Sequence, residues 1–289
     1  MNTIRGIVVT LSIGCALFQC IACSSWKRES STSKVSDRAY TAIVTDNGVG
    51  CSVGYSGGVE YTTDGGHTWI AGLNRSVCLF GVEITGKGTT FATGNQRNFV
   101  RSEDGGAHWS RMENIGAGQG KSISFCDEQT GWASSSLWAG CTSDAGSSWK
   151  ALALPSEVKV VETVCCIGQD SGIIAGADGR LFRTDDGGAS WLELTSPFAR
   201  KDDQWQAQFG KTTQGLSLRF SGLQGIAAAI GTFKGTGVLM IRETVDGGKT
   251  WSKAQRFPFE TVPLSVFADL QRNVSVFGSD RTVTLFSRK

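Results

Sequence analysis

Apolar and polar residues alternate in short runs along most of the chain after about residue 38, and Gly, Asn and Asp separate the runs. The first three runs read AYTAIVT, VGCSVG and GGVEYTT, at residues 39–45, 49–54 and 57–63. Alternation with a period of two is typical of β-strands that bury one face, and no helical period is sustained anywhere. The pattern therefore predicts an all-β protein of short strands joined by tight turns.

One eight-residue segment recurs five times with Asp, Gly or Ala, and Trp at fixed offsets, and we call it the Asp turn. It reads TTDGGHTW, SEDGGAHW, TSDAGSSW, TDDGGASW and TVDGGKTW. Its aspartates and tryptophans are Asp64 and Trp69, Asp104 and Trp109, Asp144 and Trp149, Asp186 and Trp191, and Asp246 and Trp251. The first three intervals between aspartates are about 40 residues, which is the length of one four-stranded propeller blade.

Strands can be assigned backward from each Asp turn by their alternation, which gives five units of four strands and a sixth unit of three. Propellers usually complete such a last unit with a strand from the other end of the chain. We therefore expect residues 38–289 to form one β-propeller domain of six four-stranded antiparallel blades. Seven blades are the alternative if the gap between Trp191 and Leu216 holds more structure. Residues 24–37 are then either the closing strand or a polar tether.

The residue types of the Asp turn suit a structural role. A carboxylate can accept several backbone N–H groups of a tight loop, and glycines supply the positive φ that such a loop requires. The Trp ring covers the hairpin and its indole N–H finds an acceptor. Ala145 replaces the usual Gly in the third turn, which weakens that turn. The segment lacks the Gly-Lys-Ser/Thr of a phosphate loop and the closing Glu of a calcium loop, so we expect no metal or cofactor here.

The pattern S/T-x-D-x-G-x-T/S-W resembles the Asp-box of bacterial-neuraminidase-type repeats, and the resemblance covers about residues 40–289. It implies a β-propeller of the sialidase-like class with the Asp-boxes on the face away from the ligand entrance. The fuller units at residues 125–149 and 172–191 are most similar to the photosystem II stability/assembly factor family. That similarity implies a role in assembling a protein complex at a membrane.

Residues 1–23 have the pattern of an export signal. A single Arg5 precedes an apolar run that is too short to be a good membrane span. The run ends at Ala22 and Cys23, which resembles the lipobox of bacterial lipoproteins and implies lipidation of Cys23, although Cys20 occupies the position where Leu is usual. A soluble secreted protein and an uncleaved anchor are the alternatives.

Six cysteines remain after the signal: Cys51, Cys78, Cys126, Cys141, Cys165 and Cys166. An even number in an exported chain permits disulfides, yet a domain of this size does not require them. Cys126 and Cys141 are expected on the first and third strands of one blade, roughly 9 to 10 Å apart, which is too far for a bond. Buried thiols and one or two bridges both remain open, and no zinc-binding spacing occurs.

Catalytic residues are hard to assemble from this sequence, and we expect none. A sialidase needs an arginine triad, a Tyr with a Glu partner and an acid/base Asp, but the three tyrosines all fall in the first unit. Asp178 and Asp280 are the one pair of carboxylates expected to face the entrance. The remaining acidic and imidazole candidates fall at strand exits or inside Asp turns, where turn capping explains them: Asp46, Asp127, Asp170, Asp269, His67 and His108.

Partner binding is the function that the loops favour. Loops between second and third strands emerge opposite the Asp turns, and Arg and Trp are favoured at contact hot spots. The insertion at residues 196–215 is expected either to cross that face with Phe198, Trp205 and Phe209 exposed, or to extend a blade edge. The candidate partner-binding residues are Arg97, Trp138, Arg200, Lys201, Trp205, Lys234 and Arg281.

The function predicted from these observations is an exported, monomeric, non-catalytic propeller that docks a protein complex at the membrane or cell envelope. A net charge of +2 gives no support for nucleic-acid binding. The alternatives are solvated loops without a partner, and a carbohydrate-binding or glycoside-hydrolase propeller.

Overall fold

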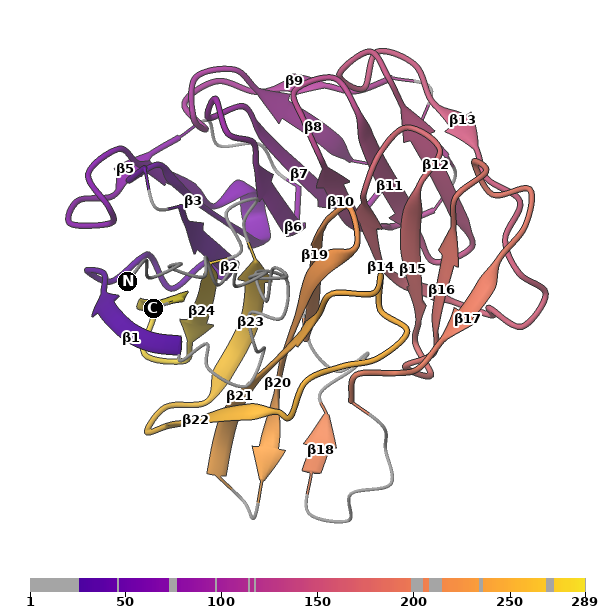
Figure 1. Ribbon diagram of the computed structural model, residues 1–289. Helices are drawn as coiled ribbons and strands as arrows, with labels where there is room; N and C mark the ends of the chain where they lie inside the picture. The colour runs from indigo at the N-terminus through magenta and orange to yellow at the C-terminus, as the bar shows by residue number, and fades with distance from the viewer. Residues whose placement is uncertain are drawn as a thin grey trace, which may run out of the picture.

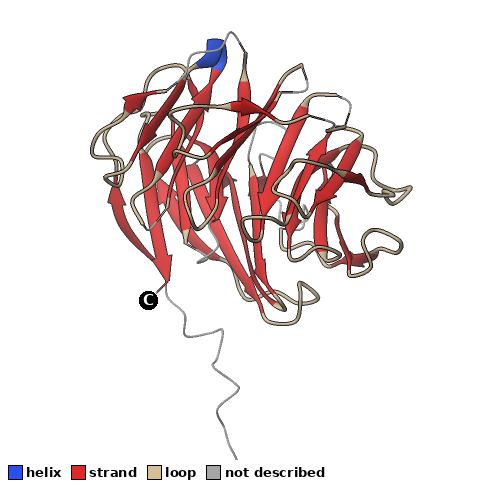
Figure 2. Ribbon diagram, turned by 90° about the horizontal axis from the view of Figure 1, so that it is seen from above, coloured by secondary structure: helices blue, strands red, loops and turns tan. Residues whose placement is uncertain are grey.

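Six antiparallel sheets stand in a closed ring around a central channel (Figure 1). The computed structural model describes residues 26–45, 47–72, 77–96, 98–113, 115–116, 118–198, 205–207, 215–233, 236–268 and 273–288. Figure 2 shows strands and loops almost throughout, and the short helical segment is the 3-10 turn η2 (Tyr55–Gly57). The prediction of an all-β, six-bladed propeller is confirmed.

The blades follow one another along the chain, and each runs from an inner strand at the channel to an outer strand at the rim. The first three are β2 (Ala39–Val44), β3 (Gly50–Gly54), β4 (Val59–Thr62) and β5 (Ile70–Ala71); β6 (Leu79–Ile84), β7 (Thr90–Gly94), β8 (Phe99–Ser102) and β9 (Ser110–Arg111); and β10 (Gly120–Phe125), β11 (Gly131–Ser135), β12 (Trp138–Thr142) and β13 (Lys150–Ala151).

The other three blades repeat this order. They are β14 (Val161–Cys166), β15 (Gly172–Gly176), β16 (Leu181–Thr184) and β17 (Leu192–Leu194); β19 (Leu216–Ser221), β20 (Gln224–Phe233), β21 (Thr236–Thr244) and β22 (Gln255–Phe259); and β23 (Pro263–Ala268), β24 (Val274–Gly278), β25 (Val283–Arg288) and β1 (Trp26–Ser31).

The sixth blade takes its outer strand from the beginning of the described chain. Strand β1 pairs antiparallel with β25, and Trp26 lies opposite Arg288. The Trp26 side chain is buried in a cluster that includes Phe259 and Phe286. In Figure 1 the indigo β1 lies beside the yellow C-terminal strands. Of the two alternatives for residues 24–37, the described part forms a strand, and the ring is closed by segments from both ends of the described chain.

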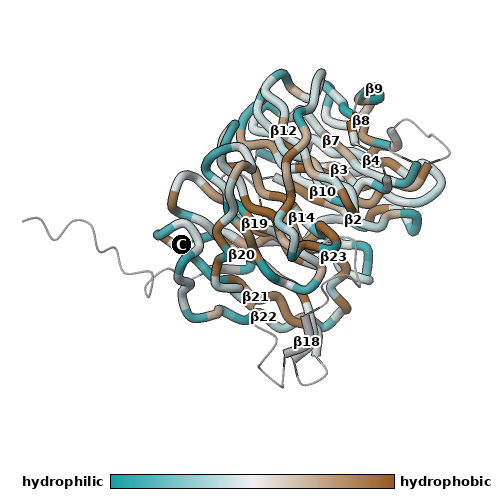
Figure 3. Tube along the Cα trace, turned by 90° about the vertical axis from the view of Figure 1, so that its right-hand side faces the viewer, coloured by the Kyte–Doolittle hydropathy of each residue, from teal (hydrophilic) through white to brown (hydrophobic). Residues whose placement is uncertain are grey.

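The hydrophobic core lies between neighbouring blades, so the inner sheets are buried on both faces. One cluster joins Ile43 and Val53 of the first blade to Val82 and Val100 of the second. Burial on both faces explains why β3, β7, β11, β15 and β24 are buried along their whole length. Figure 3 shows the most hydrophobic colouring on inner and second strands such as β10, β14, β19 and β20.

The fifth blade departs from the others at the insertion. Its strands β20 and β21 are ten and nine residues long, and β18 (Trp205–Ala207) pairs with the end of β20. The described part of the insertion therefore extends this sheet and adds no seventh blade. The prediction that Phe198 is exposed is wrong, because its ring fills a cluster between the fourth and fifth blades.

Residues 1–25 lie outside the described residues, so the export signal and the lipidation of Cys23 stay predictions. Within the part of the chain that the structure describes, no helix is long and apolar enough to cross a membrane.

Candidate binding face and central channel

The two ends of the ring carry different loops. Because the strands of each blade run alternately up and down, the Asp turns between third and fourth strands emerge at one end, which we call the Asp-turn face. Loops between second and third strands, and the links between blades, emerge at the other end, which we call the entrance face.

Each Asp turn is held by the same hydrogen bonds. Thr62 Oγ1 lies 2.7 Å from Asp64 Oδ1 and accepts from the Gly66 amide at 3.0 Å. Thr68 donates its amide and its hydroxyl to the two carboxylate oxygens of Asp64, at 2.9 and 2.6 Å. Equivalent bonds surround Asp104, Asp144, Asp186 and Asp246. These bonds to the Asp carboxylate are made by groups of the turn itself, without a ligand.

These donors stabilise the ionised carboxylates. The hydroxyl of Ser148 is the main cause that lowers the pKa of Asp144 to about 2, and the hydroxyl of Ser190 does the same for Asp186. For Asp104 the His108 amide is the leading donor, and the pKa is again about 2. The Asp turns are therefore charged structural elements at all ordinary pH values.

His108 has a role that the sequence pattern did not reveal. It occupies the position that Thr or Ser fills in the other turns, and its Nδ1 lies 2.6 Å from Asp104 Oδ2. Its side chain is exposed, as expected, yet it completes the turn as the hydroxyls do. The spacing in the sequence contains the signal for this role, because His108 lies four residues after Asp104, just as Thr68 lies four residues after Asp64.

Four of the five Asp-turn tryptophans use their indole N–H in two ways. The buried Trp69 Nε1 has no hydrogen-bond partner among the described residues, so the prediction that each indole finds an acceptor is wrong for the first turn. Trp109 and Trp149 donate to carbonyls within their own turns, at Gly106 and Gly146. Trp191 and Trp251 instead donate to the preceding blade, to Ala153 O at 2.7 Å and Thr195 O at 2.9 Å. The second pair therefore ties each of these blades to the one before it.

A buried ion pair crosses the central channel. Arg219 on β19 donates from Nη2 to both Glu83 oxygens at 2.7 and 2.8 Å, and both side chains are at most 3% exposed. Its Nη1 donates to Ser124 Oγ and Phe125 O, and its Nε donates to Ala268 O. All five N–H bonds of the guanidinium are thus used. This one side chain links the second, third, fifth and sixth blades.

The rest of the channel is lined by small hydroxyl side chains that bond across the blades. Thr41 Oγ1 lies 2.8 Å from Ser265 Oγ, and Ser122 Oγ lies 3.0 Å from Thr163 Oγ1. Ser122 and Thr163 line a cavity together with the Arg219–Glu83 pair, and its volume is about 30 Å³. That volume holds one or two water molecules, whereas small-molecule sites usually have roughly 300 Å³ or more. This cavity is too small for a sugar or a peptide.

A ring of β-bulges marks the channel mouth on the entrance face. The inner strands of five blades each carry a bulge at their second residue, which redirects the side chain there. The bulged residues are Tyr40, Phe80, Lys121, Glu162 and Leu264. The fifth blade lacks this bulge, because β19 pairs with β20 without a shift in register.

The mouth has an aromatic side and a charged side. Tyr40 packs against Tyr55 and Phe80 with ring centroids 5.7 and 5.8 Å apart, and Tyr40 and Tyr55 are each 39% exposed. On the third and fourth blades, Lys121 lies 3.8 Å from Glu162, and burial raises the pKa of Glu162. Two further apolar side chains, Leu137 and Val262, are exposed in loops of the same face. The entrance face therefore offers apolar contact area beside an ion pair.

The predicted partner-binding residues are only partly described. Trp138 is half-buried and packs edge-on against Trp149, with 6.3 Å between ring centroids. Arg281 donates to the Ala39 carbonyl and lies over the Phe277 ring, so it connects the sixth blade to the first. Trp205 belongs to β18, while Arg97, Arg200, Lys201 and Lys234 lie outside the described residues. Their role in binding stays a prediction.

The two carboxylates expected at the entrance cap their own loops. Asp178 accepts from the Arg180 amide and from its Nε at 2.8 Å, and Asp280 accepts from the Thr282 amide and hydroxyl. They belong to the fourth and sixth blades. Asp127 caps its turn by accepting from the amides of Gln129 and Thr130. In the described part of the chain, no three His, Cys, Asp or Glu side chains are grouped to hold a metal ion.

The fold and its two faces define a six-bladed β-propeller. No family model matches the chain, and no curated protein matches it. Similar solved structures include YCF48 from Cyanidioschyzon merolae, at 18% identity and a TM-score of 0.54, over 90% of this chain and 98% of that one. The WD40 β-propeller domain of Doa1 matches at 13% identity and 0.59, over 91% and 97%.

An ancestral GH74 enzyme matches at 13% identity with a TM-score of 0.52, over 89% of this chain and 39% of that one. At these identities the likeness concerns the fold alone. Propellers of this shape therefore include both a WD40 domain and an enzyme, so the fold alone does not define the function of this chain.

Proposed function

We propose that this chain is an exported, lipid-anchored, monomeric Asp-box propeller that binds a protein partner at its entrance face and does not catalyse a reaction. The observation that carries the proposal is the exposed aromatic group at the channel mouth. Tyr40 and Tyr55 present rings with a polar tip, which supply large contact areas at protein interfaces. The neighbouring Lys121–Glu162 pair gives this surface a defined charge pattern for recognition.

The channel supports binding on the surface rather than chemistry inside it. Its cavity of about 30 Å³ has no room for a substrate. The charged side chains that line it, Arg219 and Glu83, neutralise each other, and a glycosidase would need two carboxylates that face a shared cleft. The glycosidase and carbohydrate-binding alternative would have to use the entrance face as well.

The repeated Asp turns support a relation to Asp-box proteins and, through the fuller units, to the photosystem II assembly factor family. The family implies a complex at a membrane as the partner. Export by residues 1–23 and lipidation of Cys23 place the protein at the cell envelope in this proposal. Labelling with palmitate in the native host tests the anchor, and the Cys23→Ser variant should lose both the label and the membrane association.

The binding proposal is tested by crosslinking and affinity capture from the native envelope. Tyr40→Ser together with Tyr55→Ser removes the aromatic surface without altering a buried residue. The matched control is Leu223→Ser with Val245→Ser, which removes exposed apolar side chains, 58% and 52% accessible, from the Asp-turn face. We expect the first variant to lose a defined set of captured proteins at least tenfold and the control to retain it.

A captured set that survives the Tyr40 and Tyr55 substitutions, or that is lost in the control, contradicts the entrance-face proposal. The Arg97→Ala variant and a variant with a shortened 197–213 loop then test the predicted partner-binding residues that lie outside the described part of the chain. If neither the wild type nor the variants capture a partner protein, binding of the wild type to a glycan array becomes the next measurement.

A further inference from the structure

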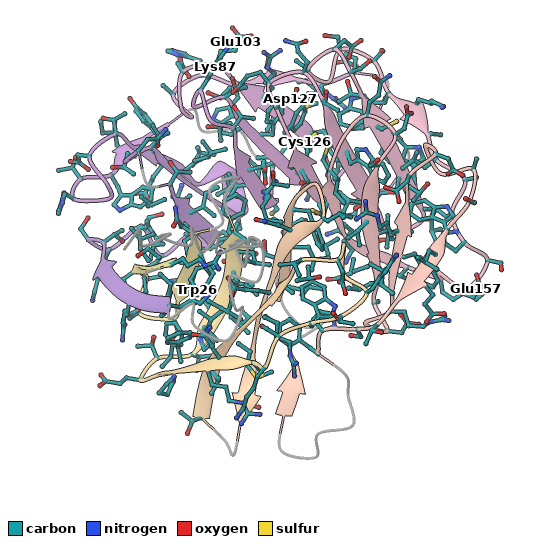
Figure 4. The ribbon with its side chains drawn as sticks, viewed as in Figure 1. Trp26, Lys87, Glu103, Cys126, Asp127 and Glu157 are labelled. Carbon is teal, nitrogen blue, oxygen red and sulfur yellow. The ribbon has the colours of Figure 1, made fainter. Side chains whose placement is uncertain are left out.

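Two thiols meet between the third and fourth blades. Cys126 follows β10, and Cys166 is the last residue of the neighbouring inner strand β14. Cys126 Sγ lies 3.6 Å from the Thr130 carbonyl oxygen, Cys166 Sγ lies 3.7 Å from the same oxygen, and both residues pack in one hydrophobic cluster. Figure 4 shows Cys126 beside Asp127, toward the end of the molecule that carries Lys87 and Glu103 and away from Glu157.

The pairing follows from how adjacent inner strands are aligned. The Cys166 amide donates to Ser124 Oγ at 3.2 Å, and the Val164 amide donates to Ser122 Oγ at 3.3 Å. These bonds hold β10 and β14 in a fixed register, so the ends of both strands lie at the same level. Both sulfurs contact the Thr130 carbonyl oxygen, and side-chain rotation has to bring them to about 2.05 Å from each other for a covalent bond.

The two thiols are chemically different. Cys126 is half-buried, and the hydrogen bond from Cys166 lowers its pKa, with a further contribution from the Arg219 guanidinium. Cys166 is buried, and burial raises its pKa. A more accessible thiol that ionises readily beside a buried one is the arrangement of an attacking thiol and a resolving thiol.

The other described thiols are placed differently. Cys165 points into the cluster between the fourth and fifth blades, and Cys51 is buried between the first and second. Cys141 lies on β12 in the same cluster as Cys166 and Cys126, but within the described part of the chain its sulfur makes no hydrogen bond to the Thr130 carbonyl oxygen that both of the others approach. Cys126 and Cys166 are the two thiols whose sulfurs share an acceptor among the hydrogen bonds of the described residues.

We propose that Cys126 and Cys166 form a reversible disulfide that joins the third blade to the fourth, made by thiol–disulfide exchange with a small-molecule disulfide or a protein dithiol oxidase. The Cys126 thiolate attacks one sulfur of the oxidant, the oxidant's S–S bond breaks, and one thiolate leaves. Cys166 then releases its proton, and its sulfur attacks Cys126 Sγ and displaces the second thiolate. The pair loses two electrons and two protons, and the oxidant is reduced to two thiols.

The test uses the purified full-length protein in detergent, equilibrated with oxidised and reduced glutathione over a range of ratios. Acid quenching, alkylation and mass spectrometry of the whole chain and its peptides then count free thiols and locate the crosslink. A Cys165→Ala background assigns the bond to Cys166, because no protease separates the two adjacent residues. We expect two thiols to become resistant to alkylation and one crosslinked peptide pair to join Cys126 to Cys166.

Single substitutions distinguish a specific pair from general oxidation. Cys126→Ser should prevent the crosslink, and Cys166→Ser should trap a glutathione adduct on Cys126 because the resolving thiol is missing. Cys141→Ser is the matched control and should leave the crosslink unchanged. We also expect the oxidised protein to unfold in denaturant about tenfold more slowly than the reduced protein.

Circular dichroism checks that each variant is folded. The proposal is overturned if wild type keeps both thiols alkylatable in fully oxidised glutathione, or if the crosslinked pair does not contain Cys126 and Cys166. It is also overturned if Cys166→Ser fails to accumulate the adduct in a folded protein.

Discussion

At the scale of single residues, Arg219 shows how one charge can organise a ring of sheets. Removing a guanidinium and a carboxylate from water is expensive, and only full hydrogen bonding offsets that penalty. Arg219 achieves it with partners on three other blades, at Glu83, Ser124, Phe125 and Ala268. The pair therefore specifies which inner strands face each other, besides closing the channel to larger molecules.

Substitution of Arg219 by Met should destabilise the protein strongly, because Glu83 then remains as a buried carboxylate without its partner. We expect the free energy of unfolding to fall by about 3 to 5 kcal/mol. Arg219→Met combined with Glu83→Leu should recover much of this loss. Equilibrium unfolding in guanidinium chloride measures both variants.

The control is Glu103→Gln, which breaks an ion pair with Arg101 in which the Glu103 side chain is 76% exposed. An exposed pair contributes less than about 1 kcal/mol. An Arg219→Met effect no larger than the control effect would show that the channel pair does not hold the blades in place.

At the scale of elements, the Asp turn acts as a unit that is repeated around one face. Its hydrogen bonds lie within five residues, so each turn forms the same geometry regardless of the blade that carries it. Ala145 adopts φ 57° where the other turns have Gly at positive φ, which shows that the geometry is kept even where the residue is unfavourable. The turn is therefore robust to single departures from its pattern.

The Asp turns predict a loss of stability in acid. The pKa of Asp144 is about 2 in the folded protein and 3.8 ordinarily. A carboxylate with a lowered folded pKa stabilises the protein above its ordinary pKa, and that contribution is lost as the pH falls through about 4 to 2. Ser148→Ala removes the main hydrogen bond and should make the loss between pH 4 and 2 shallower.

Ser147→Ala is the matched control in the same turn, because Ser147 Oγ donates to the main-chain oxygen of Asp144 rather than to its carboxylate. Unfolding by urea at a series of pH values, with NMR titration of Asp144, provides the comparison. Equal pH profiles for the two serine variants would contradict the assignment of the shift to Ser148.

At the scale of the whole molecule, the ring depends on one non-local pairing. Strand β1 covers the edge of β25, and Trp26 fills the space between the fifth and sixth blades. An uncovered β25 would present unpaired N–H and C=O groups to another chain. Strand β1, which lies within the segment 24–37 predicted as either a closing strand or a polar tether, is therefore part of the fold.

Deleting Trp26–Ser31 should leave β25 as an open edge, and the protein should associate into dimers and larger species. Size-exclusion chromatography with light scattering measures the change. A synthetic peptide of residues 26–36 should restore the monomer, whereas a scrambled peptide should not. A deletion variant that stays monomeric and equally stable would show that β1 does not close the ring.

The architecture was predictable because its signals are local and repeated. Alternation marked the strands, and the spacing of Asp64, Asp104 and Asp144 marked the blades. The candidate site was much less predictable. Tyr40 and Phe80 lie within ordinary alternating runs, and only the bulges in β2, against β3, and in β6, against β7, bring them to the channel mouth. Trp138 and Arg281 are predicted from their loops to bind a partner, and in the structure both make contacts within the protein.

The sequence by itself determined the features that depend on neighbours a few residues apart: the strand period, the Asp turns and the blade length. Tertiary structure alone decided which distant residues meet. Glu83 and Arg219 are 136 residues apart, and each looks like a polar position in a strand until the ring places both in the channel. Cys126 meets Cys166 for the same reason, since the register between β10 and β14 is a property of packed blades. Local hydrogen bonding can be read along the chain, whereas contacts across the channel exist only once all six blades have closed.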